Sequence, residues 1–299
     1  MALLNGFNRE PYPNGDSYEG QYKKGARHGA GTYYCANGAH YEGLFKDGMM
    51  DGAGTYFYTR NECFEGEWLD SMRHGRGTFT YHDGTVYEGR WEGDLRHGQG
   101  LMRYADGSAY NGSWGEDLRH GQGQMSFADG AQYSGSWGKD MRDGNGSLRL
   151  SNGSSYEGEF FEDIPEGPGK LFDADEQSDY TGQFHAGLRH GQGKCAYSKT
   201  GDKFAGEWSA GARVHGAMFL ASGEVEKVGY LNDKLVRREK LSERETAKLR
   251  AEDNGETFFE PEEPPVVQVQ DAPEVQDAPE ALPAAADLLP GPAEAIAAN

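Results

Sequence analysis

The chain has 299 residues, 45 of them glycine, and its 49 acidic against 29 basic residues give a formal net charge of −20. This charge argues against a general binder of nucleic acid or of anionic lipid, because like charges repel. Aromatic residues make up 12% of the chain, which argues against disorder over most of its length, because stacked rings bury surface.

Residues 1–11 are interpreted as an N-terminal extension that precedes the first repeat. Their apolar run, residues 1–4, is far too short for a signal peptide or a membrane span. The chain has three cysteines and shows no secretory signal, which predicts a reducing, cytoplasmic compartment.

A series of aromatic residues recurs at a fixed step along residues 12–231. The step is 23 residues at first and 24 residues for the last two members; the series is Tyr18, Tyr41, Phe64, Tyr87, Tyr110, Tyr133, Tyr156, Tyr180 and Phe204. Such a period indicates an array of small supersecondary units. We count nine units, followed by an eroded tenth that places Lys227, Gly229 and Leu231 at the motif positions.

Each unit is predicted to be a β-hairpin. In the fourth unit Tyr87, Gly89 and Trp91 alternate along the chain, so they share one face of a strand. The glycine leaves a slot on that face, and we expect a ring of a neighbouring unit to lie over it. Gly98-x-Gly100-x-Met102 predicts the second strand. Two residues further on, the same face carries Tyr58, Tyr81, Tyr104, Phe127, Leu150 or Tyr197.

Asn-Gly or Asp-Gly pairs separate most units. They are Asn14-Gly15, Asn37-Gly38, Asp83-Gly84, Asp106-Gly107, Asp129-Gly130 and Asn152-Gly153. These pairs tolerate positive φ at both central positions, as tight hairpin turns require. The sequence therefore predicts an all-β fold, an elongated antiparallel β-hairpin meander in which each unit packs on its neighbours.

The loop inside most units contains an Arg-His pair, so that arginines recur along one edge of the predicted sheet. Examples are Arg73, Arg96, Arg119 and Arg189. One interpretation is a strip that binds phospholipid or another anion. The other is support within the sheet, with the arginines paired to Glu65, Glu88, Asp94 and Asp117, and the match to the repeat period favours it.

Motifs for chemistry are not found in the sequence. It has no C-x-x-C pair, zinc-ligand spacing or phosphate-binding loop, and no Ser–His–Asp set stands out. Cys35 and Cys195 occupy positions that are inward and apolar in other units. We therefore predict that the protein is not an enzyme and has no catalytic residue, metal site or cofactor.

The seventh unit departs from the pattern over residues 165–179. Its loop lacks Arg-His. Pro168 lies between its paired glycines, where proline removes a backbone N–H that would otherwise donate to the neighbouring strand. The sequence leaves open whether this break contacts another subunit or is repeat drift. As candidate interaction residues we take the aromatics of the repeat face and the break itself: Trp68, Trp91, Trp114, Trp137, Ile164 and Pro168.

The chain changes character after the repeats. Residues 232–251 are rich in Lys, Arg and Glu with interspersed leucines, and they predict a charged surface helix. Residues 252–299 contain 12 acidic residues and no Lys or Arg, with many Pro and Ala. Such a segment buries too little apolar surface to fold alone, so we predict a disordered acidic tail.

The repeat resembles the MORN repeat family (membrane occupation and recognition nexus). The family motif is Tyr-x-Gly-x-Trp, a short loop and Gly-x-Gly, and YEGRWEGDLRHGQG at residues 87–100 matches it closely. The stretch IPEGPGKLFDADEQSDYTGQF, residues 164–184, is similar to a region of radial spoke head MORN proteins of motile cilia. Two further well-formed units follow it here, which points to a paralogue within that group.

The resemblance implies a structural scaffold in the radial spoke head of the axoneme, a cytoskeletal location in the cilium or flagellum. Implied partners are other spoke-head subunits, the central-pair projections and, for a homo- or heterodimer, a second MORN protein. An alternative is a membrane- or phosphoinositide-associated MORN adaptor, since some family members bind membranes. The net acidity of the chain weighs against the alternative.

Overall fold

The computed structural model describes residues 5–232 and 234–254. These residues form 21 β-strands and one short α-helix, which confirms the predicted all-β class. The chain divides after Asp140 into two compact units, and each is described by itself. The predicted tail lies almost entirely outside the described residues.

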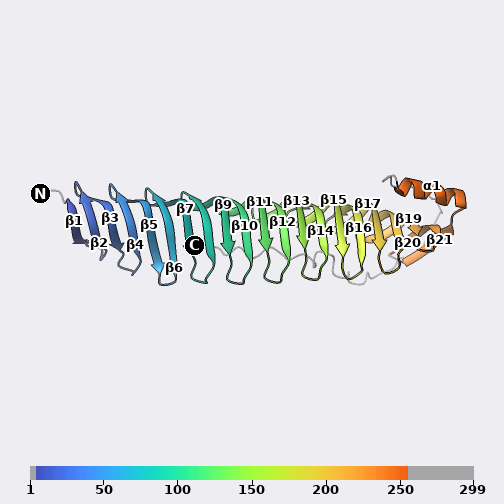
Figure 1. The fold of residues 1–299 in the computed structure, drawn as a ribbon, viewed down its shortest axis with the longest axis horizontal. Helices are drawn as coiled ribbons and strands as arrows, with labels where there is room; N and C mark the ends of the chain where they lie inside the picture. The colour runs from blue at the N-terminus through green and yellow to red at the C-terminus, as the bar shows by residue number, and fades with distance from the viewer. Residues whose placement is uncertain (1–4, 233, 255–299) are drawn as a thin grey trace, which may run out of the picture. The chain divides into compact units, whose positions relative to one another are not determined.

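The first unit is an antiparallel meander of twelve strands, which Figure 1 shows in chain order. They are β1 (Gly6–Pro11), β2 (Ser17–Lys23), β3 (Ala26–Tyr34), β4 (His40–Lys46), β5 (Met49–Thr59), β6 (Glu62–Leu69), β7 (Met72–Thr80), β8 (Val86–Glu92), β9 (Leu95–Arg103), β10 (Ala109–Gly115), β11 (Leu118–Ser126) and β12 (Gln132–Gly138). Each strand pairs with the next one in the chain. The first of them, β1, lies in what we took for an extension, because it covers the free edge of β2.

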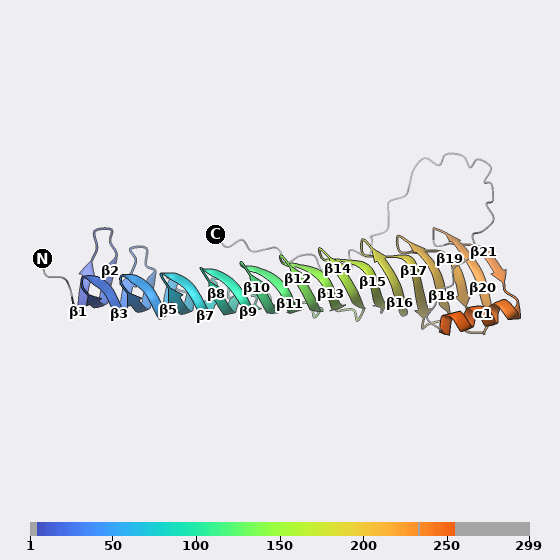
Figure 2. The ribbon, with the colours of Figure 1, turned by 90° about the horizontal axis from the view of Figure 1, so that it is seen from above.

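The second unit continues the same topology with nine strands and a helix. They are β13 (Met141–Arg149), β14 (Ser155–Phe161), β15 (Ile164–Asp173), β16 (Ser178–His185), β17 (Leu188–Tyr197), β18 (Lys203–Ser209), β19 (Ala212–Phe219), β20 (Val225–Leu231), β21 (Lys234–Lys240) and α1 (Glu243–Asn254). Consecutive strands again pair antiparallel. Figure 2 shows α1 beside the last strands of this unit.

Two-residue turns join the strands within a repeat. Glu116 and Asp117, which connect β10 to β11, have φ of 49° and 68°. Positive φ at both central residues is the signature of a type I′ turn, whose twist matches that of the flanking strands. The tight turns therefore lie inside the repeats, at the loops that the sequence analysis treated only as carriers of Arg and His.

The Asn-Gly and Asp-Gly connections between repeats are wider turns. In the connection from β7 to β8, Gly84 has φ of 91°, and Asp83 is not among the residues with positive φ. The Gly84 N–H donates to the Tyr81 carbonyl at 3.0 Å, and the Asp83 carboxylate accepts from the Thr85 N–H at 2.8 Å. The prediction of positive φ at both residues is wrong here, because the Asp side chain closes the turn in place of a second left-handed residue.

The core of each repeat is a ring that lies over a pair of glycines. Gly89 on β8 and Gly100 on β9 are register partners, and a Cβ atom at either position would overlap the Tyr87 ring. The Tyr87 hydroxyl donates to the Arg90 carbonyl at 3.0 Å. The prediction that a neighbouring repeat supplies this ring is wrong. Because the tyrosine lies two residues before its glycine on the same face, its side chain extends along its own strand and fills the slot.

The predicted helix over residues 232–251 is wrong in its first half. Residues 234–240 form β21, because the edge of β20 offers backbone donors and acceptors that a second strand satisfies. The helix α1 begins only at Glu243. The Ser242 backbone N–H donates to the Glu245 carboxylate at 3.0 Å, and the Glu245 N–H faces the Ser242 hydroxyl oxygen at 3.4 Å, which is a capping box.

The eroded tenth repeat is present with a different register. Tyr230 takes the second aromatic position, since its ring contacts Phe204 edge-on at 6.0 Å and Arg213 stacks on it at 4.3 Å. Leu231, which the sequence analysis placed there, is 65% exposed. A shift of one residue moves a strand's side chains to the opposite face of the sheet. The predicted register therefore assigned every side chain of this strand to the wrong face. Glu226 replaces the first aromatic and forms an ion pair with Arg238 of β21.

The helix α1 covers the end of the second unit. Leu249 packs with Ala217 and Val225 in a small buried cluster, and the Arg250 guanidinium donates to the Gly223 carbonyl. Ala217 follows the second glycine of its repeat, where Leu101 stands in the fourth repeat. The smaller side chain leaves room for the helix, so α1 covers apolar surface near the last strands.

The glycine pair gives a direct test of the core. We expect Gly100→Ala to destabilise the protein by about 3 kcal/mol, because the added methyl overlaps the Tyr87 ring and the core must shift. Gly115→Ala is the matched control: Gly115 also lies in a strand, but its added Cβ approaches another heavy atom only at 3.8 Å. Urea unfolding followed by tryptophan fluorescence measures both changes. Equal effects of the two substitutions would contradict this account of the core.

The buried tyrosines predict loss of stability in alkaline solution. Burial raises the pKa of Tyr41 from 10.0 to about 12 and also raises that of Tyr87. A raised pKa in the folded state means that the neutral phenol stabilises the fold below pH 10, and that this contribution is lost as pH rises toward 12. We expect the free energy of unfolding to fall by roughly 1.4 kcal/mol per pH unit for each such tyrosine. Tyr41→Phe should flatten the slope in denaturant titrations from pH 8 to 12, and an unchanged slope would refute the assignment.

Candidate interaction surface

The tryptophans form the second layer of the aromatic core. The Trp114 ring packs edge-on against Tyr110 of its own repeat at 5.2 Å and against Tyr87 of the preceding repeat at 5.3 Å. Its indole N–H donates to the Gly100 carbonyl at 3.4 Å. Each tryptophan thus joins two repeats, and the edge-to-face geometry is the favoured one for aromatic pairs.

The four predicted interaction tryptophans do not form a surface. Trp68, Trp91, Trp114 and Trp137 are only 4–5% exposed. Each is covered by rings of two repeats, and Trp91, Trp114 and Trp137 also carry a stacked arginine of the preceding repeat, as for Arg96 over Trp114 at 4.5 Å. Burial of these rings stabilises the sheet, and a partner that contacted them directly would have to open the core.

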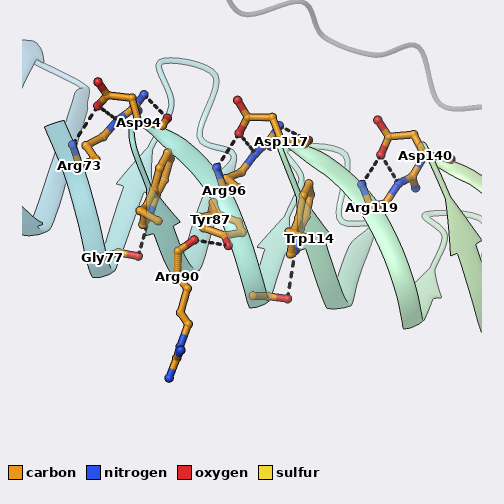
Figure 3. A network of polar contacts seen from close by, with 12 residues as sticks. Arg73, Gly77, Tyr87, Arg90, Asp94, Arg96, Trp114, Asp117, Arg119 and Asp140 are labelled. Carbon is orange, nitrogen blue, oxygen red and sulfur yellow. Dashed lines mark hydrogen bonds and ion pairs between the residues drawn. The ribbon is translucent and has the colours of Figure 1, made fainter.

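The arginines of the Arg-His loops form a ladder between repeats, shown in Figure 3. The Arg96 backbone N–H and its Nε both donate to Asp117 Oδ1 at 2.8 Å, and Nη2 donates to the Asp117 carbonyl at 2.8 Å. In return, the Asp117 N–H donates to the Arg96 carbonyl at 3.2 Å. The same set of contacts recurs at Arg73–Asp94 and Arg119–Asp140, and in the second unit at Arg142–Asp163.

These contacts decide between the two interpretations of the arginines. Asp94 and Asp117 are partners, as predicted, whereas Glu65 and Glu88 are not. Glu88 is the register partner of Leu101 on the opposite face of the sheet, and its carboxylate lies 3.8 Å from Arg103. The ladder guanidinium groups are stacked on rings and hydrogen-bonded to aspartates, which supports their role within the sheet over that of an anion-binding strip.

A second set of aromatic side chains remains accessible on the same face as the tryptophans. We call it the aromatic row, and it consists of Tyr58, Tyr81, Tyr104 and Phe127. Tyr58 is 36% exposed and the other three are half-buried. Tyr81 packs on Phe79 with ring centroids 4.4 Å apart. The sequence placed these residues on one face, but only the structure shows that they, and not the tryptophans, reach the surface.

The opposite face of the first unit carries its own exposed apolar residues. Met49, Met72, Leu95 and Leu118 begin their strands at one position of the repeat and are 38–44% exposed. Charged and polar neighbours such as Glu92, the register partner of Leu95, interrupt them. Met72 has an exposed apolar register partner in Leu69, whereas Met49 pairs with Lys46. Scattered apolar residues are an ordinary surface feature, so the aromatic row is the stronger candidate for binding.

The break in the seventh repeat presents an apolar corner in the second unit. Phe161 and Ile164 are register partners on either side of a tight turn and are 59% and 45% exposed. Pro165 is buried and Pro168 is exposed, and Pro168 still pairs in register with Gln183. Of the six predicted interaction residues, Ile164 and Pro168 are thus the two that the structure leaves accessible.

Neither a metal-binding cluster nor a membrane-spanning helix occurs in the described part of the chain. Residues 5–232 and 234–254 contain no group of three or more His, Cys, Asp or Glu side chains that could hold a metal ion. The three cysteines are free, and burial raises the pKa of the Cys195 thiol. In the same residues, no helix has both the length and the apolar composition of a membrane-spanning segment.

Comparison with protein families identifies the repeat. The MORN repeat matches eight segments: residues 18–40, 41–61, 64–86, 87–109, 110–132, 133–155, 156–177 and 180–200. Among curated proteins, none matches the chain. The ninth and tenth repeats of the fold lie beyond these eight matches.

Solved structures with some similarity include TCP domains of SAS-4 and CPAP. The TCP domain of SAS-4 (dCPAP) of Drosophila melanogaster, solved with a proline-rich motif of Ana2 (dSTIL), is 14% identical and has a TM-score of 0.32, with 51% of this chain and 83% of that chain covered. The wild-type TCP10 domain of Danio rerio CPAP is 11% identical with a TM-score of 0.33, covering 78% of this chain and 100% of that one. Similarity at this level supports no inference about function.

The ladder predicts a specific loss of stability. We expect Asp117→Gly to destabilise the protein by about 2 kcal/mol, because it leaves the half-buried Arg96 without its charged acceptor. Glycine is chosen because Gly48 and Gly211 occupy the equivalent turn position, so the backbone strain is not increased. Glu88→Ala, which removes an exposed pair with Arg103, should change stability by about 0.5 kcal/mol or less. Thermal unfolding followed by circular dichroism compares the two, and similar values would contradict the ladder's importance.

Proposed function

This chain belongs to the MORN repeat family, and from that membership and its repeat geometry we infer that it is a protein-interaction scaffold. Its repeats offer long surfaces with side chains at regular intervals. Repeat proteins of this kind hold partners along an extended face instead of in a pocket. The observation that carries the inference is the aromatic row, a periodic set of accessible rings beside the buried tyrosines and tryptophans of the repeat core.

We propose further that the scaffold is a subunit of the radial spoke head in the axoneme of cilia or flagella. The proposal rests on residues 164–184, whose sequence is similar to a region of radial spoke head MORN proteins. In this role it would contact other spoke-head subunits, support their contact with the central-pair projections and so contribute to ciliary motility. The mild acidity of the repeats is compatible with brief, non-adhesive contacts.

The apolar corner at the break supports a subunit contact there. Phe161 replaces the polar or small residues Glu92, Gly115 and Gly138 that follow the second aromatic in the three central repeats. Phe161 is 59% exposed, and an exposed apolar side chain that joins a neighbouring one in a patch is a candidate contact surface. Ile164, paired with Phe161 across the turn, enlarges the same patch.

A co-purification experiment tests this proposal. We expect the full-length tagged chain, expressed in ciliated cells, to co-purify with isolated axonemes and to cross-link to spoke-head subunits. Ile164→Ser should reduce its recovery with axonemes several-fold, because it removes half of the exposed apolar corner. Leu95→Ser is the matched control, since Leu95 holds the same repeat position and is 40% exposed.

Two results would contradict the proposal. The first is absence of the chain from axonemes of cells that express it. The second is equal recovery of the two variants, which would separate the corner from the subunit contact.

A further inference from the structure

We propose that the aromatic row binds a proline-rich, basic segment of a partner protein in the polyproline II conformation. The inference rests on the proposed scaffold function and names the kind of partner that the row fits. Three independent observations carry it: free hydroxyl groups on the row, the spacing of its rings and the charge of the turns beside it.

The first observation concerns the phenol groups of Tyr58, Tyr81 and Tyr104. Most tyrosines of the first unit use their hydroxyl inside the fold, as Tyr87 does with the Arg90 carbonyl. Within the described part of the chain, these three row hydroxyls have no hydrogen-bond partner. Their rings are anchored by neighbours, as for Tyr58 on Phe79 at 5.6 Å. The row therefore offers fixed aromatic surfaces with unused donors.

A polyproline II segment supplies what these groups need. It forms no internal hydrogen bonds, so its carbonyl oxygens are free to accept from phenol hydroxyls. Its proline rings pack flat on aromatic side chains, and its conformation is largely set before binding, which lowers the entropic cost. Protein modules that bind such segments use the same pairing of exposed rings with a few donors.

The spacing of the row matches the repeat of this conformation. Tyr81 follows β7 and Tyr104 follows β9, so two strand intervals separate them, about 9.6 Å in a sheet. Three residues of polyproline II span about 9.3 Å. From Tyr58 to Phe127 the mismatch accumulates to only about 1 Å over three repeats. An α-helix repeats its face every seven residues, about 10.5 Å, and drifts out of register about three times faster.

The charge beside the row favours a basic partner. Asp83, Asp106 and Asp129 are exposed in the turns that follow Tyr81, Tyr104 and Phe127, two residues beyond each ring. Hydrogen bonds from the Ser108 hydroxyl and backbone keep the pKa of Asp106 below its ordinary value, so it is ionised at neutral pH. Arg60 stands in this place beside Tyr58, and other repeats carry Asn14, Asn37 and Asn152, so the acidic turns lie beside Tyr81, Tyr104 and Phe127.

The wider surroundings of the row are also negatively charged. Residues 64–140 contain 12 acidic and seven basic residues. Lys or Arg between the prolines would meet these carboxylates, whereas the chain's own proline-rich segment, residues 255–299, contains ten acidic and no basic residues. Although that segment is also rich in proline, its carboxylates would be repelled by the acidic turns, so it is the poorer occupant of the aromatic row.

Calorimetric titration of the full-length protein tests the proposal. The probe is a synthetic 12-residue peptide with proline at every third position and several Lys or Arg between the prolines. We expect binding that weakens with salt, and at least tenfold weaker binding by Tyr81→Ser/Tyr104→Ser. Tyr81→Phe/Tyr104→Phe, which keeps the rings and removes only the hydroxyls, should weaken binding about threefold. The phenylalanine variant keeps the ring packing, so it still tests the proposal if the serine variant fails to fold.

Controls separate the row from other surfaces. Leu95→Ser/Leu118→Ser alters the opposite face and should leave peptide affinity unchanged. A peptide with every proline replaced by glycine should bind at least tenfold more weakly, because it is not preorganised.

The proposal is overturned if both tyrosine variants bind like the unaltered protein or if the glycine peptide binds equally well. Tighter binding of a peptide corresponding to residues 265–280 would also overturn it in favour of the chain's own tail. Preference for an amphipathic helical peptide would overturn it as well. If the peptide fails while the protein still co-purifies with axonemes, only the partner class is wrong and the spoke-head proposal stands.

Discussion

The whole sheet depends on one contact, the aromatic ring that lies over a pair of facing glycines. The pair lets the Tyr87 ring lie directly on the backbone of its own hairpin, where any side chain at Gly100 would collide with it. That ring then gives the edge-on contacts for Trp91 of its own repeat and Trp114 of the next. A single-layer sheet has no second sheet or helix to pack on over most of its length, so this contact replaces the usual core.

The arginine ladder is a second consequence of that packing. Arg73, Arg96 and Arg119 each stack on the tryptophan of the following repeat and bind the aspartate in that repeat's tight turn, as Arg96 does with Trp114 and Asp117. The left-handed conformation of the turn residue brings its N–H and carbonyl to the preceding strand. Aromatic, cationic and backbone contacts therefore join the same neighbours, and loss of one weakens a coupled set.

Function follows from what this arrangement leaves on the outside. The tryptophans and ladder arginines are engaged between repeats, so the accessible features are the aromatic row, the apolar corner at Phe161 and Ile164, and the acidic turns. All three are surfaces suited to holding a partner. The row is periodic because the repeat is, whereas the corner recurs only where both turn-flanking positions are apolar, as at Leu69 and Met72.

The repeat, the all-β class and the pairing of hairpin strands follow from the amino-acid pattern alone, because the 23-residue period and the alternation of Tyr87, Gly89 and Trp91 are local signals. The same pattern indicated Asp94 and Asp117 as arginine partners. The folded structure was needed to show that each ring fills the slot of its own repeat, and that Tyr230 and not Leu231 completes the tenth. It also decided that residues 234–240 form a strand and that the tryptophans are buried while Tyr81 and Tyr104 are accessible. These outcomes depend on which neighbour covers a side chain or an open edge, and the pattern within one strand does not show which neighbour that is.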